Sequence, residues 1–197
     1  MDTDLYEQFI ILKDSGRKAE AKVSLDLFIA SFATLEQKRD WVYSYLEEGK
    51  YGQRIRHEIY ENLVYPVLLD GYLRNDANSV AWLAKTANNL YKVKSPHPVL
   101  KGKHEFTLFK ETHDLEPSAE VEAELLSALL KWFSYAQHEW PAGILYGPNG
   151  ADISESEEYL LDVQFARSLD RDKEHEDFLS QFESKVREYI QRLQTRA

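Results

Sequence analysis

The chain has 197 residues, 43% of them hydrophobic and 29% charged, a composition typical of a folded globular protein that excludes general disorder. It contains no cysteine, which excludes disulfides, thiol nucleophiles and thiolate-bound metals. The formal net charge of -10 argues against direct nucleic-acid binding, because such binding needs a basic face that displaces phosphate counterions. A basic protein partner suits this charge better.

The chain also lacks the sequence signs of membrane targeting. Its first residues, MDTDLYEQF, are acidic, whereas a secretory signal begins with basic residues. No stretch reaches the roughly 20 consecutive apolar residues that span a bilayer. We therefore expect a cytoplasmic protein with no membrane contact.

Apolar residues recur at helical spacing over the first ninety residues, in stripes within 5–12, 21–32, 35–46, 55–68 and 80–90. Thr34, with Gln37 three residues later, predicts a capping box, and Gly49 marks the end of the helix that follows. Pro66 is expected to kink or break its helix. Asn75 or Asp76 is expected to cap the next one.

The helical pattern lapses between Lys92 and Pro117, where a segment around 104–110 fits either a short helix or a strand. It resumes in stripes within 121–140, 159–166 and 178–193. The sequence predicts an all-α fold of seven or eight helices, arranged as a helical bundle or a short stack of antiparallel helical hairpins. We expect one domain over 1–197, with a candidate subdivision in the irregular connector 92–117.

Two turns, KDSGRKAEA around Gly16 and LEEGKYGQR around Gly49, each end one helix and begin another, and their glycines lie 33 residues apart. With Gly16, Glu20 and Ala21, the first turn resembles the inter-helix turn of tetratricopeptide repeats, whose period is about 34. The second turn keeps Gly49 but has Arg54 where that family places a small residue. The resemblance covers residues 5–70 and implies stacked helical hairpins. Two unrelated hairpins that each needed a C-terminal glycine are the alternative.

The negative charge is concentrated in the second half. Through residue 98 there are 13 Lys/Arg and 14 Asp/Glu, and from residue 99 there are 11 and 20. The acidic residues cluster at three expected helix starts, within 116–124, 152–158 and 170–177. Acids at a helix start stabilise its dipole, which is one explanation. The other is an acidic recognition face, in which the first and third clusters merge at one end and the second lies at the far end.

Basic residues gather in the irregular connector. Lys92, Lys94, Lys101, Lys103 and Lys110 lie there with His97, His104 and His113. They either balance the local acidic field or form a docking loop for a phosphate or an acidic partner.

The stretch Trp140–Asp162 contains the sequence Gly-Pro-Asn-Gly, but it lacks the lysine and Ser/Thr of a phosphate-binding loop. Ser154 and Glu157 instead predict a capping box. Trp140, Leu145 and Tyr146 either pack in a corner of the core or form an exposed apolar tip, since Trp and Tyr often anchor interfaces. In the second case the partner-binding residues would be these three with Glu120, Glu124, Glu155 and Glu158.

Catalytic and metal-binding patterns are absent from the sequence. It has no Glu-x-x-His, no His-Glu-x-x-His and no Gly-x-Ser-x-Gly. His57 and Glu61 share a helix face but supply only two ligands. We therefore predict no metal, no cofactor and no assigned catalytic residue.

These observations lead to a non-enzymatic protein-interaction module whose acidic C-terminal half binds a basic protein surface. One form would be an inhibitor or immunity-type protein for a nucleic-acid-acting protein, an inference by analogy only. The alternative is an enzyme of an unrecognised helical class, in which His57 meets a carboxylate from another helix in a central cleft. A homo-oligomeric scaffold is the third hypothesis.

Overall fold

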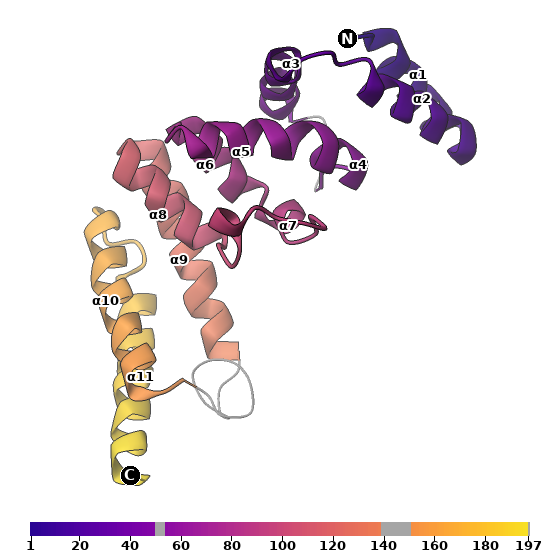
Figure 1. The fold of residues 1–197 in the computed structure, drawn as a ribbon. Coiled ribbons are helices and arrows are strands. Elements are labelled where there is room, and N and C mark those ends of the chain that lie inside the picture. The colour runs from indigo at the N-terminus through magenta and orange to yellow at the C-terminus, as the bar shows by residue number, and fades with distance from the viewer. Residues whose placement is uncertain (50–53, 139–150, 197) are drawn as a thin grey trace. The chain divides into compact units, whose positions relative to one another are not determined.

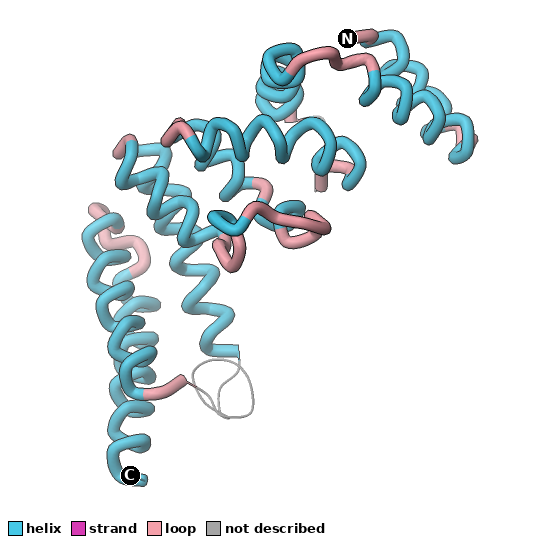
Figure 2. Tube along the Cα trace, in the orientation of Figure 1, coloured by secondary structure: helices cyan, strands magenta, loops and turns pink. Residues whose placement is uncertain are grey.

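The structure is a computed structural model that describes residues 1–49, 54–138 and 151–196. Within these ranges every regular element is a helix and no strand occurs (Figures 1 and 2). The predicted all-α class is therefore confirmed. The predicted seven or eight helices are an undercount, because the described ranges contain eleven α-helical segments.

Contacts within the chain group it into two compact units, residues 1–108 and 109–197. The boundary falls inside the segment 92–117 that the sequence marks as irregular. Charge divides at the same place. The first unit has 15 Lys/Arg and 15 Asp/Glu, and the second has 9 and 19, so the second unit carries the whole net charge of -10.

The first unit is built from short helices. In chain order they are α1 (Thr3–Asp14), α2 (Lys18–Ala30), α3 (Leu35–Glu48), α4 (His57–Ile59), the π-helix η1 (Tyr60–Val64), α5 (Tyr65–Leu73), α6 (Ala77–Lys85), α7 (Ala87–Leu90) and the 3-10 helix η2 (Pro98–Leu100). Helix α8 (Glu105–Leu115) spans the boundary between the units, so the segment around 104–110 is helical.

The helix ends of the first unit follow the predicted signals. The Thr34 hydroxyl accepts a hydrogen bond from the Gln37 N–H at 3.2 Å, whereas the Gln37 side chain accepts from the Ala33 N–H at 3.0 Å, so only one half of the predicted capping box forms. Gly49 ends α3 with a left-handed φ of 63°. The Asp76 side chain accepts from the Ser79 N–H and caps α6. Pro66 lies in the first turn of α5, immediately after the π-helical turn η1. The proline is therefore accommodated where the helix changes its hydrogen-bonding pattern, since it has no N–H to donate.

Aromatic side chains join α1, α2 and α3. The Trp41 ring stacks on Tyr45 at 4.6 Å and meets the edges of the Tyr6 and Phe28 rings at 5.5 and 5.1 Å. Phe28 is fully buried, as is Leu25 one turn before it on α2. These contacts form the core of the N-terminal part of the first unit.

A close approach fixes α5 against α6. A Cβ built on Gly71 would lie 1.8 Å from the Oγ of Ser79, so no larger residue fits there without movement. Ser79 is fully buried, and its hydroxyl lies 2.5 Å from an Asp76 carboxylate oxygen and 2.6 Å from the Tyr43 hydroxyl. Gly71 thus lets two helices meet across a buried polar network.

The second unit contains the end of α8 and three longer helices, α9 (Ala119–His138), α10 (Ile153–Leu169) and α11 (Glu176–Arg196). The Phe133 ring of α9 stacks on Phe182 of α11 at 4.6 Å, and Tyr159 of α10 meets Phe182 edge-on at 5.7 Å. All three residues are buried. One aromatic cluster therefore forms the core where the three helices meet.

The capping box of α10 lies two residues earlier than the sequence predicts. Asp152 accepts from the Glu155 N–H at 2.8 Å, while the Glu155 carboxylate accepts from the Asp152 N–H at 2.9 Å. Ser154 and Glu157 are exposed residues within the helix instead. The Asp-x-x-Glu pair forms the box because it lies directly before the first helical residue.

Candidate functional site

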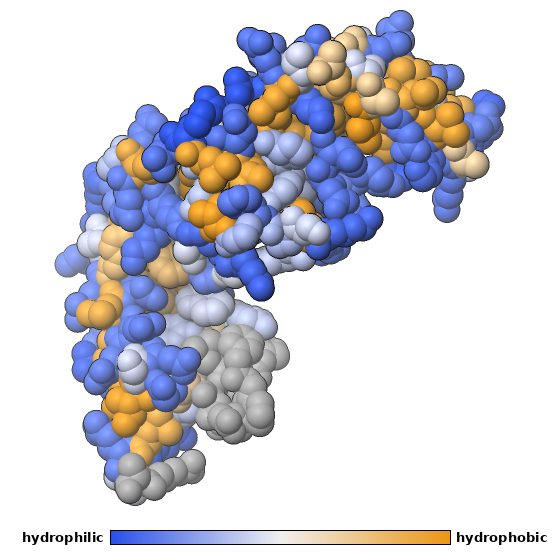
Figure 3. Space-filling model, in the orientation of Figure 1, coloured by the Kyte–Doolittle hydropathy of each residue, from blue (hydrophilic) through white to orange (hydrophobic). Residues whose placement is uncertain are grey.

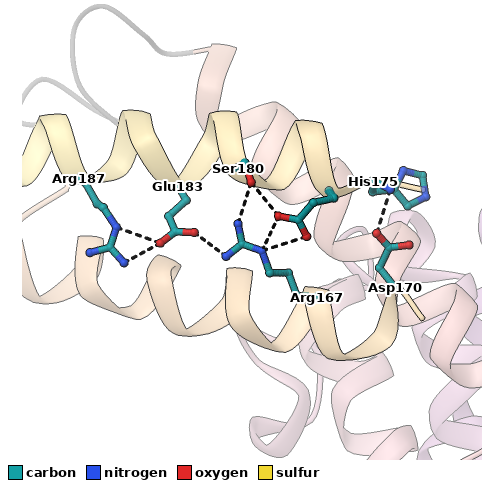
Figure 4. A network of polar contacts seen from close by, with 7 residues as sticks. Arg167, Asp170, His175, Ser180, Glu183 and Arg187 are labelled. Carbon is teal, nitrogen blue, oxygen red and sulfur yellow. Dashed lines mark hydrogen bonds and ion pairs between the residues drawn. The ribbon is translucent and has the colours of Figure 1, made fainter. Parts of the chain in front are cut away.

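The turn between α10 and α11 is held by one buried carboxylate. Asp170 is 7% exposed and accepts a hydrogen bond from the His175 N–H at 2.9 Å (Figure 4). It accepts a second from the Glu174 N–H at 3.1 Å. Lys173 in this turn has a left-handed φ of 57°, which is unusual for a residue with a side chain. Asp170 therefore fixes the path of the backbone into α11.

Arg167 on α10 neutralises two acids of α11. Its guanidinium lies 3.1 Å from Glu176 and 2.5 Å from Glu183, which also pairs with Arg187 at 2.6 Å (Figure 4). Hydrogen bonds from Arg167 and Arg187 lower the pKa of Glu183. Ser180, with Arg167, lowers the pKa of Glu176. These two carboxylates thus serve the α10–α11 contact.

A second arginine connects the same turn to α9. The Arg171 guanidinium lies 2.6 Å from the Glu122 carboxylate, which belongs to the first turn of α9. The starts of α9 and α11 therefore lie at the same end of the second unit. Arg171 is 72% exposed, while the Glu122 side chain is only 21% exposed.

These elements enclose a shallow groove between the start of α9 and the α10–α11 turn. Small or apolar side chains line part of it, namely Ala119, Ala123, Leu126 and Leu169. Charged and polar side chains line the rest, namely Glu122, Asp170, Arg171, Asp172, Glu174 and His175. Asp172 and Glu174 are exposed and form no ion pair among the described residues. We call this feature the acidic groove.

The start of α10 lies at the other end of the unit. The Tyr189 hydroxyl, in the C-terminal half of α11, donates to the Ala151 carbonyl at 3.0 Å, two residues before α10 begins. Tyr159, in the first half of α10, stacks at 6.4 Å on Trp132, in the second half of α9. The cluster 152–158 is thus separated from the acidic groove by most of the length of α10.

The predicted partner-binding residues accordingly fall into separate places. Glu120 and Glu124 lie in the first turns of α9, each next in sequence to a residue that lines the acidic groove, but neither lines the groove itself. Glu155 and Glu158 are exposed in the first turns of α10, so the structure does not bring these four carboxylates together. Trp140, Leu145 and Tyr146 lie outside the described residues, and their role stays a prediction.

Asp162 on α10 is a titratable group that the sequence analysis did not single out. Burial raises its pKa to about 6, while nearby Lys110 opposes the rise and Glu158 adds to it. One turn earlier, Tyr159 is 3% exposed, and its hydroxyl has no hydrogen-bond partner among the residues that the structure describes. The sequence signal was the position of Asp162 midway between the aromatic residues Tyr159 and Phe165, which lie three residues to either side and share its helix face.

His57 does not meet a carboxylate from another helix among the described residues. Its Nε2 lies 2.9 Å from Glu61, one turn further along the same helical run, and the two side chains are 38% and 25% exposed. This is a local surface pair, not the inter-helix pair that the enzyme alternative requires. In the part of the chain that the structure describes, no group of three or more His, Asp or Glu side chains is arranged to hold a metal ion.

The basic connector is divided between the units. Lys92, Lys94 and Lys101 are exposed in the first unit, where the Lys103 ammonium lies 5.7 Å from the centre of the Tyr72 ring. In the second unit the Lys110 ammonium lies 5.7 Å from the centre of the Phe165 ring. The five lysines thus do not form one surface within either unit.

Comparisons with known proteins returned no matching family model, no matching curated protein and no matching solved structure. No helix in the described ranges combines the length and apolar character needed to cross a membrane.

Proposed function

We propose that the second unit is a non-enzymatic docking module that binds a basic protein segment in the acidic groove. The observation that carries this proposal is the placement of Asp172 and Glu174 at the edge of a groove lined in part by Ala119 and Ala123. Small side chains leave room for a partner's backbone or side chain, and the exposed carboxylates favour Lys or Arg.

The charge distribution supports the same partner class. The second unit carries the entire net charge of -10, so it attracts a cationic partner at long range. Pairing within the unit cannot remove this charge, because the unit has 19 Asp/Glu and only 9 Lys/Arg.

One form of this function is inhibition of a protein that acts on nucleic acid. The basic surface of such a partner binds phosphates, and an acidic module would compete for the same surface. This version of the proposal specifies a nucleic-acid-binding partner, and competition between the module and DNA for that partner tests it. Excess duplex DNA should displace the module from a partner of this kind.

The experiment measures binding of a labelled peptide in which Arg alternates with Ala, using fluorescence anisotropy at increasing salt. The variant D172N/E174Q should weaken binding roughly fivefold, since each exposed pair contributes about 0.2–1 kcal/mol. The matched control E157Q/E158Q removes the same charge at the α10 start and should change binding less than about twofold.

Two results would contradict the proposal. If binding is insensitive to salt, electrostatic docking is wrong. If E157Q/E158Q weakens binding more than D172N/E174Q, the binding surface lies at the α10 start and not in the acidic groove. A peptide with Gln in place of Arg measures the contribution that does not depend on charge.

A further inference from the structure

Helix α2 has a second apolar stripe that faces away from its core side. The core stripe consists of Ala21, Leu25 and Phe28, which are 4%, 0% and 0% exposed. The second stripe consists of Ala19, Val23, Leu27 and Ala30, at spacings of four, four and three residues. Such spacing places all four on one face, almost opposite the core stripe.

The outer stripe is open to solvent. Val23 is 58% exposed and Leu27 is 53% exposed, and both alanines are also exposed. Ile11 on the neighbouring α1 is 68% exposed. Figure 3 shows apolar side chains gathered over the α1–α2 pair on the face in view. A helix with apolar residues on two opposite faces is normally covered on both.

The charges beside the stripe indicate what covers it. Lys22 and Asp26 lie on one flank of the outer stripe, one helical turn apart, and pair with each other at 2.5 Å. When two identical helices pack antiparallel about a two-fold axis, the same flank of each helix faces its counterpart in the opposite direction. Lys22 of one copy would then meet Asp26 of the other, and the reverse pair would form as well.

We propose that α2 is a self-association surface, through which two copies of this chain form an antiparallel, two-fold symmetric dimer. Val23 and Leu27 of each copy fill the centre of this interface. Ala19 and Ala30 at the two ends of the stripe let the helices approach closely. The face is self-complementary in charge and carries the same apolar stripe on both copies, as a two-fold dimer requires.

A single pair of faces on helices of 13 residues makes a small interface, so the dimer should be weak and dependent on concentration. Sedimentation equilibrium over a wide concentration range should show the mass rising from 23.0 kDa toward twice that value. The variant V23Q/L27Q should raise the dimer dissociation constant by more than about tenfold. The control L161Q removes a comparably exposed leucine, 64% exposed on α10, and should leave the dissociation constant unchanged.

A charge exchange tests the antiparallel arrangement directly. K22E and D26K should each weaken the dimer, because each places like charges opposite one another, and the double variant K22E/D26K should restore it. If Lys22 and Asp26 interact only within one helix, these substitutions should change the melting temperature and leave the measured mass unchanged.

A mass of one chain at every concentration would overturn the proposal. So would a dimer that V23Q/L27Q leaves intact. Either result leaves peptide binding in the acidic groove unaffected, because that function resides in the other unit.

Discussion

Arg171 and Glu122 lie 49 positions apart in the sequence, yet a guanidinium nitrogen of one is 2.6 Å from a carboxylate oxygen of the other. This pair joins the α10–α11 turn to the first turn of α9. Among the described residues that line the acidic groove, Arg171 is the only arginine. Arg171 therefore both defines the groove and reduces its negative charge.

Replacing Arg171 with Ala should strengthen binding of the Arg-Ala peptide, by about twofold to fivefold, because Glu122 then becomes available to the peptide. The fold should be little affected, since Arg171 is 72% exposed. Fluorescence anisotropy at low salt measures the change. The control R187A removes the same charge outside the groove, and an equal gain in both variants would mean that only net charge matters.

Gly71→Ala should destabilise the protein by about 2–3 kcal/mol, because the new Cβ would clash with the buried Ser79 side chain. Urea unfolding measures this loss. The double variant G71A/S79G lacks the clashing atoms of Ser79. Its loss of stability should therefore be smaller than the sum of the losses of the two single variants. Strict additivity of the two single changes would show that the close approach is not the cause.

Asp162 predicts a dependence of stability on pH. Its pKa is raised from 3.8 in the unfolded chain to about 6 in the folded protein, so the folded protein retains the proton over this range. The associated stability is full below about pH 4 and is lost as the pH rises through about 6. D162N should therefore be more stable than the wild type at pH 7, by about 1 kcal/mol after allowing for solvent screening.

Urea unfolding at a series of pH values between about 4 and 7 tests this prediction. The difference between D162N and the wild type should grow as the pH rises. A difference that stays constant over the whole range would show that Asp162 does not titrate there. D172N, which removes an exposed carboxylate on the α10–α11 turn, is the matched control.

Arg167→Met should destabilise the protein by about 1 kcal/mol, because Glu176 and Glu183 lose their shared cation. The pKa values of both carboxylates are lowered in the folded protein, so this stability is present at neutral pH and lost as the pH falls below their ordinary values. The difference between variant and wild type should therefore shrink in acid. R187M, which loses a more exposed arginine, should cost less than about 0.5 kcal/mol.

Local signals in the sequence predicted local structure well. Thr34, Gly49 and Asp76 each mark a helix end where predicted, because capping depends on residues within one turn of the chain. The two-residue error at Asp152 arose because two capping patterns overlap, Asp152 with Glu155 and Ser154 with Glu157, and the sequence does not show which one is used. The hydrophobic pattern around 104–110 fits neither the helical nor the strand period clearly, and only the structure shows that this segment belongs to a helix.

The candidate site could be predicted only in part. The three acidic clusters are visible in the sequence. The pairing of Glu176 with Arg167 and of Glu122 with Arg171 is not, since each pair joins residues from different elements of the fold. The outer stripe of α2 is also present in the sequence. It is recognised only when Val23 and Leu27 are seen to remain exposed after the core stripe is buried.

By itself the sequence determined the all-helical class, the positions of most helix ends and the excess of acid in the second half. These follow from hydrophobic period, capping and composition, which are properties of neighbouring residues. Tertiary structure alone decided that Gly71 meets Ser79, that Arg171 reaches Glu122, and that the α10 start lies far from the acidic groove. Such contacts depend on how helices pack, and packing joins residues whose separation along the chain carries no signal.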